Sequence, residues 1–152
     1  MLNQTIKTGH ENMDITTIHH FLSHHSYWAK GISYDLVENA LTNSYCVGAF
    51  IHDNQIGFGR VVTDYSTFAY LADFFVLPEY QGNGVAKKIL SHIFQQPWTK
   101  RLRRIMLATR DAHELYRQFQ FKDLKNPSIM MEIHNPDVYA QSAHDVAPPN
   151  PQ

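Results

Sequence analysis

Residues 74–86 carry the residue types of an anion-binding site. An apolar run, residues 74–77, ends at Pro78, and the sequence Gln-Gly-Asn-Gly-Val-Ala follows at 81–86. From residue 85 to 93, apolar residues recur at helical spacing. The pattern predicts a strand, a glycine loop and the start of a helix. Loop glycines allow close approach of a ligand, and the first N–H groups of a helix favour phosphate.

The spacing within residues 81–86 excludes two common phosphate loops. The Walker pattern requires Lys and Ser/Thr after its last glycine, but Gly84 is followed by Val85. The dinucleotide pattern requires a third glycine where this chain has Lys87. The segment instead fits Gln/Arg-x-x-Gly-x-Gly/Ala, from Gln81 to Ala86. A glycine turn that only joins a strand to a helix is the alternative.

A second segment, residues 104–121, predicts another strand followed by a short helix. The strand is expected at Ile105–Ala108 and the helix at about 112–119. Thr109 or Asp111 is expected to cap the helix by accepting its first N–H groups.

Together the two segments resemble the GNAT superfamily of N-acetyltransferases. Val76-x-Pro78-Glu79-Tyr80 and the loop after it are similar to the coenzyme A loop of that family. Ala112, Leu115-Tyr116 and Phe121 are in register with the second family block. The resemblance covers about residues 45 to 133. Gln120 departs from it, because the family usually has Gly where the helix ends in a left-handed conformation.

The resemblance implies transfer of an acetyl group from acetyl-CoA to a primary amine of a small molecule or peptide, by direct attack in a ternary complex. It implies that the loop amides hold the pyrophosphate, and that strands splay apart where the Val76 N–H meets the thioester carbonyl. It also implies that the Tyr116 hydroxyl acts as the acid for the leaving thiolate; a Tyr packed on the apolar face of its helix is the alternative. The expected acetyl-CoA-binding residues are Phe75, Val76, Gln81, Gly82, Asn83, Gly84, Val85 and Ala86.

Asp73 is the predicted base that makes the attacking amine neutral. Its carboxylate stands inside an apolar strand, where it is costly unless it is paired or wet. A structural partnership with Arg60 or Tyr70 is the alternative. Tyr70 and Asp64 are further candidates for the base.

The acceptor site has no readable motif. Tyr27 and Trp28, between two predicted helices, and Tyr70 are the expected substrate-binding residues, although Trp28 is equally well explained by packing under the sheet. His20 and His24 have a zinc-compatible spacing, but an exposed polar helix face is favoured and no metal is predicted. A basic cluster, comprising Lys100, Arg101, Arg103 and Arg104, suggests either a contact to the 3′-phosphate of CoA or, preferably, a solvated turn.

Composition and charge set the class of protein. The 152 residues favour one domain, and a formal net charge of −1 gives no reason to expect nucleic acid. Cys46 is the single cysteine, and neither a secretory signal nor a membrane-spanning run is visible, so a cytoplasmic protein is expected. A homodimer is left open. A non-catalytic acyl-CoA-binding or sensing domain is the alternative to the enzyme, and a phosphate-binding module unrelated to CoA is a third hypothesis.

The predicted fold class is α/β, of α+β type: one GNAT-like domain over residues 1–134 and an irregular or disordered tail over 135–152. Helices are expected after Asp14 and Ser33. A mixed, mainly antiparallel sheet with helices on its faces is expected from strands at 45–51, 56–62, 67–77, 105–108 and 129–133.

Overall fold

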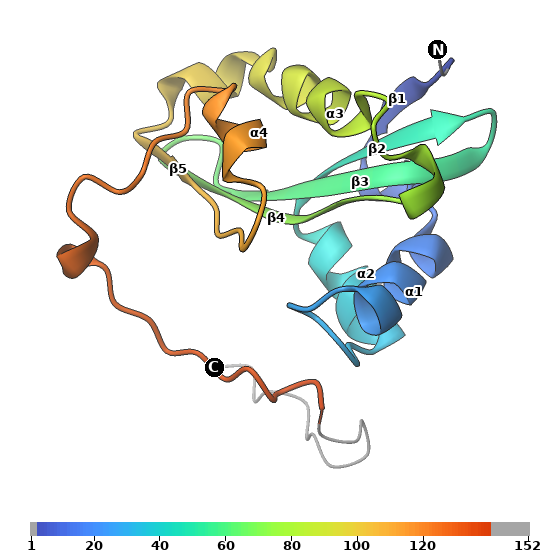
Figure 1. Ribbon diagram of the computed structural model, residues 1–152, viewed down its shortest axis with the longest axis horizontal. Coiled ribbons are helices and arrows are strands. Elements are labelled where there is room, and N and C mark those ends of the chain that lie inside the picture. The colour runs from blue at the N-terminus through green and yellow to red at the C-terminus, as the bar shows by residue number, and fades with distance from the viewer. Residues whose placement is uncertain (1–2, 141–152) are drawn as a thin grey trace. The chain divides into compact units, whose positions relative to one another are not determined.

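The computed structural model describes residues 3–140. The strands in this range are β1 (Thr5–Thr8), β2 (Tyr45–Ile51), β3 (Asn54–Thr63), β4 (Phe68–Val76) and β5 (Arg104–Met106). The α-helices are α1 (Ile15–His25), α2 (Tyr34–Thr42), α3 (Val85–Phe94) and α4 (His113–Arg117). The strands form one sheet in chain order, β1 to β5 (Figure 1). The α/β class with a mixed sheet is therefore confirmed.

Within the described range, the chain forms two compact units. The first, residues 3–14 and 40–123, contains the whole sheet together with α3 and α4. The second, residues 15–39 and 124–140, contains α1 and most of α2. The residues of the predicted cofactor loop and both predicted catalytic residues belong to the first unit.

The sheet is antiparallel from β1 to β4, and only β5 runs parallel to its neighbour. The ladder between β4 and β5 joins Phe68–Tyr70 to Arg104–Met106, at the N-terminal end of β4. Residues 71–76 of β4 run past this ladder toward the glycine loop. β5 ends at Met106, where the ladder ends, so the second half of β4 extends beyond β5 in the sheet; the splaying of strands that the resemblance implied stays a prediction.

A β-bulge interrupts β4 near its middle. Ala72 is opposite Arg60 and Phe75 is opposite Phe58. Two residues of β4, Asp73 and Phe74, are therefore opposite the one residue of β3 that lies between Phe58 and Arg60, which is Gly59. Asp73 takes a left-handed backbone conformation, with φ 59°. Such bulges bend a strand and change the direction of its side chains.

The core of the first unit lies between the sheet and α3. The apolar face of α3 is formed by Val85, Ile89, Leu90 and Ile93, all buried. These side chains share one cluster with Val47, Ile56, Val61 and Leu71 of the sheet, and Tyr116 of α4 closes it. In Figure 1, α3 and α4 therefore cover the same face of the sheet. This packing fixes the direction in which α3 points its first turn.

Four of the predicted strands are present with small changes at their ends, and the fifth is wrong. Residues 130–133 form no strand, and Pro127–Ile129 is a 3₁₀ turn. Strand formation depends on a neighbouring strand more than on residue type, and apolar residues alone do not supply one. The short strand β1 was not predicted; of the predicted tail, residues 141–152 lie outside the described range.

The predicted helix at 112–119 is shorter in the structure. It covers His113–Arg117 only, preceded by a bond in which Thr109 Oγ1 accepts the Ala112 N–H at 3.1 Å. At the start of α2, Ser33 Oγ accepts the Leu36 N–H at 3.3 Å, as expected for a cap. After α4, Gln120 has a φ of 75°, so it takes the left-handed position that the family gives to Gly.

Candidate functional site

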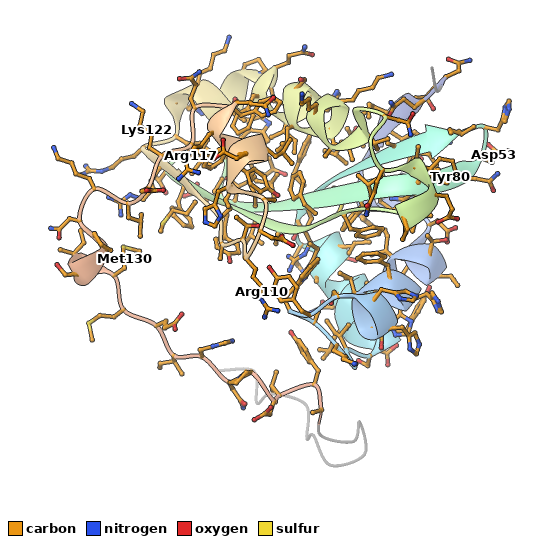
Figure 2. All side chains as sticks on the ribbon, viewed as in Figure 1. Asp53, Tyr80, Arg110, Arg117, Lys122 and Met130 are labelled. Carbon is orange, nitrogen blue, oxygen red and sulfur yellow. The ribbon has the colours of Figure 1, made fainter. Side chains whose placement is uncertain are left out.

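The glycine loop connects β4 to α3 through a 3₁₀ turn at Pro78–Tyr80. Gly82 and Gly84 both have left-handed backbones, with φ 80° and 75°, and Gly84 is the N-cap of α3. Neither glycine has another group within 4 Å of where a Cβ would stand. Tyr80 lies at the same end of the sheet as Asp53 of the β2–β3 turn (Figure 2). The loop thus presents an open backbone surface at this end.

Polar side chains of the loop fold back to support it. Gln81 Nε2 donates to the Val76 carbonyl at 3.1 Å. Asn83 Nδ2 donates to the carbonyls of Tyr80 and Gln81, at 3.1 and 3.2 Å. These bonds fix the loop from within and leave ligand contacts to its backbone.

The first turn of α3 completes an anion site. The first N–H groups of a helix have no acceptor inside it, and they carry the positive end of the helix dipole. The first turn of α3 contains no acidic residue to neutralise that end. The loop and the helix start therefore fit the pyrophosphate of a nucleotide-like ligand.

Tyr116 is buried on α4, with 8% of its surface exposed. Its ring packs edge-on against Phe74 at 6.2 Å between centroids and against Phe121 at 5.8 Å. The packing expected of a structural Tyr is therefore present, and it does not exclude a role for the hydroxyl. The catalytic role of Tyr116 stays a prediction.

Asp73 forms an ion pair with Arg60. Arg60 Nε donates to Asp73 Oδ2 at 2.6 Å, and both side chains are largely buried. Of the two partners that the sequence offered, Arg60 is the one observed; Tyr70 is opposite Val62 and Met106 in the sheet. The pairing favours the structural interpretation of Asp73 over the role of base.

Cys46 lies beside this ion pair and is buried. Burial raises the pKa of its thiol to about 12; Arg60 opposes the rise, and Asp73 and Glu11 add to it. Sγ donates to the Leu41 carbonyl at 3.4 Å. The nucleophile of cysteine chemistry is the thiolate, so this thiol is unsuited to covalent catalysis.

Asp64, a further candidate for the base, is committed to the β3–β4 turn. The pKa of its carboxyl is held well below the usual range, first by the Thr67 hydroxyl and then by backbone N–H groups. Oδ1 accepts the N–H groups of Ser66, Thr67 and Phe68 at 2.9, 2.8 and 3.2 Å. A carboxylate held in this way is a weak base.

The family model for the acetyltransferase (GNAT) family matches residues 15–121. The chain belongs to the GNAT acetyltransferase family. A "putative acetyltransferase" of Gibberella zeae is 30% identical over an alignment of 132 residues, and the match covers 69% of this chain and 74% of that protein.

Solved structures agree with this assignment. The crystal structure of a GNAT-family protein from Xanthomonas campestris is 41% identical, with a TM-score of 0.89, and covers 92% of this chain and 99% of that one. A "predicted acetyltransferase" from Clostridium acetobutylicum, crystallised with acetyl-CoA, shares the fold at 15% identity and a TM-score of 0.61; the match covers 86% of this chain and 96% of that one.

The basic cluster of this GNAT protein lies at the wrong end of β4 for the pyrophosphate loop. Arg101 Nε donates to the Tyr65 carbonyl at 2.9 Å, and the Arg103 N–H donates to the Thr67 carbonyl at 3.0 Å. Both acceptors precede β4, and the loop follows it; nine strand residues span roughly 26 Å. The cluster therefore supports the interpretation as a solvated turn.

The second unit of the GNAT chain contains two of the three predicted substrate-binding residues, Tyr27 and Trp28; the third, Tyr70, lies on β4 in the first unit and is 38% exposed. Tyr27 and Trp28 pack edge-to-face at 5.0 Å and remain 48% and 41% exposed. Their role at the acceptor site stays a prediction. His20 and His24 lie 4.8 Å apart between ring centroids, and the described residues contain no group of three or more potential metal ligands. No helix among the described residues is long and apolar enough to cross a membrane.

The structure also shows a close contact between Gly59 and Phe74 that the sequence does not predict. The ring of Phe74 lies over Gly59, at the position where a Cβ would stand 2.6 Å from the nearest ring atom. A single glycine in an apolar strand indicates a close approach by another group, but the sequence does not say which.

Proposed function

We propose that this GNAT protein transfers an acetyl group from acetyl-CoA to a primary amine of a small molecule or a peptide. The observation that carries the proposal is the open, left-handed glycine loop at the start of α3. Its backbone N–H groups, from Gly82 to Ala86, would hold the pyrophosphate of the donor. The acetyl-CoA present in the Clostridium acetobutylicum relative supports the choice of donor.

The end of β4 would bind the rest of the donor. Beyond Tyr70, β4 continues past its ladder with β5, and the backbone of Phe75 and Val76 on that edge would meet the thioester end of acetyl-CoA. The N–H of Val76 would donate to the thioester carbonyl oxygen, whose negative charge grows as the amine attacks.

Tyr116 is the proposed acid. The amine nitrogen forms a bond to the acetyl carbon, the carbon–sulfur bond breaks, and the electron pair leaves on sulfur. The phenol then gives its proton, or a hydrogen bond, to the thiolate. The amine gives its own proton to water or to a base. Because Asp73 is bound to Arg60, the proposal assigns no residue to that second step.

A panel of amines tests the proposal. Diamines, amino acids, aminosugars and peptides with a free N-terminus or a lysine are each mixed with acetyl-CoA, and release of free thiol is measured. We expect at least one amine to raise thiol release well above the rate without amine. Acetyl-CoA binding by calorimetry without any amine-dependent turnover would instead indicate the non-catalytic sensing domain. Absence of binding would overturn both.

A further inference from the structure

The bulge in β4 places the Phe74 ring directly over Gly59. A Cβ at Gly59 would stand 2.6, 2.7 and 2.8 Å from three atoms of that ring. Such contacts are not tolerated, so the ring can occupy this position only because residue 59 has no side chain. Gly59 thus forms the seat of Phe74.

A chain of polar contacts holds the bulge in place. The left-handed backbone of Asp73 is unfavourable for a residue other than Gly, and its carboxylate compensates by binding Arg60 Nε at 2.6 Å. Arg60 Nη1 donates to Ser44 Oγ at 3.0 Å, and Ser44 Oγ donates to the Ala40 carbonyl at 2.8 Å. The turn between α2 and β2 is thereby connected to the bulge.

Phe74 connects the bulge to α4 through a contact with Tyr116. Its ring meets the Tyr116 ring at 79° and 6.2 Å between centroids, an edge-to-face contact. The Tyr116 ring also packs against Phe121 at 5.8 Å and belongs to the core cluster, so Phe74 is one of the side chains that fix its direction.

We propose that Gly59, Asp73 and Phe74 are positioning residues for Tyr116. Asp73 holds the bulge through Arg60, Gly59 seats the Phe74 ring, and that ring sets the Tyr116 hydroxyl against the departing sulfur. This inference rests on the proposed function of Tyr116 as the acid. It gives Asp73 a role through its ion pair, in place of proton transfer.

The first experiment uses the ring contact. Gly59→Ala displaces the Phe74 ring, and we expect kcat to fall roughly 10- to 100-fold, as small misplacements of catalytic groups do. Affinity for acetyl-CoA should stay within a few fold. Gly48→Ala is the matched control: its Cβ meets Gln55, Phe50 and Met13, away from Tyr116. An equal loss of kcat in both variants would show a general packing effect and overturn the inference.

A double variant isolates the coupling. In Phe74→Leu the ring atoms that would collide with a Cβ at residue 59 are absent. Adding Gly59→Ala to this variant should therefore cause no further loss of kcat, so Gly59→Ala/Phe74→Leu should be no slower than Phe74→Leu alone. Independent, additive losses from the two changes would contradict the seat at Gly59.

Asp73 is tested by its pH profile. A positioning role predicts that Asp73→Asn, whose amide oxygen can still accept from Arg60, keeps most of the activity and the same profile of kcat/KM against pH. Asp73→Ala should lower the whole profile without changing its shape. Loss of one limb of the profile in Asp73→Asn would show that Asp73 is the base, and would overturn this part of the inference.

A readout independent of turnover separates this inference from the proposed function. The chain is labelled with 3-fluorotyrosine and studied by fluorine NMR. Of the signals from the eight tyrosines, that of Tyr116 is assigned by its loss in Tyr116→Phe. Gly59→Ala and Asp73→Ala should shift or broaden that signal, and Gly48→Ala should not. An unmoved signal would overturn the positioning role. Full turnover in Tyr116→Phe would instead overturn only the assignment of the acid.

Discussion

At the scale of single residues, the Tyr116 side chain has two parts that can be tested separately: a buried ring and a hydroxyl that is proposed to transfer a proton. Tyr116→Phe keeps the ring packed against Phe74 and Phe121 but removes the hydroxyl. We expect kcat to fall, by about 10²–10⁴-fold if no water substitutes. Acetyl-CoA affinity should stay within a few fold and the melting temperature nearly constant. If the hydroxyl were only a structural hydrogen-bonding group, stability would fall by about 0.5–1.5 kcal/mol with turnover intact.

The raised pKa of Cys46 predicts how the stability of the fold changes at alkaline pH. Its pKa is raised to about 12 in the folded state from 9.0, so the folded chain keeps a proton that the unfolded chain loses. Stability from this group is therefore complete below pH 9 and decreases as the pH rises above it. The free energy of unfolding, measured in urea from pH 8 to 10.5, should fall less steeply in Cys46→Ala than in the wild type. Equal slopes would contradict the shift.

At the scale of elements, the loop before α3 depends on its left-handed glycines. In Gly84→Asp, a carboxylate would face the bound pyrophosphate, and we expect acetyl-CoA binding measured by calorimetry to be lost. The fold should survive, because nothing lies within 4 Å of the new Cβ. Gly84→Asn is the matched control: it has the same size and backbone strain without the charge, so it should bind more tightly than the Asp variant. Unchanged affinity in a folded Gly84→Asp protein would place the pyrophosphate elsewhere.

The backbone conformation after α4 also favours one type of residue, glycine. Gln120 has a φ of 75°, which costs a residue other than Gly on the order of 1 kcal/mol. Gln120→Gly should therefore raise the free energy of unfolding by up to about 1 kcal/mol, although added freedom in the unfolded chain offsets part of it. Urea unfolding measures the change. Gln118→Gly, just before it in a helical conformation, is the control and should be destabilising. A fall in stability in Gln120→Gly would contradict the strain.

At the scale of the whole molecule, ligand binding should stabilise the fold. A ligand at 100 times its dissociation constant adds about 2.7 kcal/mol when it binds only the native state. We expect acetyl-CoA to raise the melting temperature clearly, and ATP or NADH to do so much less, since the loop lacks the residues that those ligands require. An equal rise with ATP, or none with acetyl-CoA, would count against the proposed donor.

The sequence by itself determined the features that depend on local backbone chemistry. The strand, glycine loop and helix from Phe74 to Ile93 could be predicted, because a proline ends the strand and two glycines allow the left-handed turns. The left-handed position at Gln120 followed from the family pattern for the same local reason. These features need few contacts from distant parts of the chain.

Only the tertiary structure decided which residues meet. Asp73 and Arg60 are 13 positions apart, and a bulge brings them together; the same bulge puts Phe74 on Gly59 and against Tyr116. No sequence period encodes a bulge, because one extra residue reverses the alternation of every side chain beyond it. The predicted strand at 129–133 failed for a related reason: a strand is completed by the hydrogen bonds of a neighbour, and residue type does not provide the neighbour.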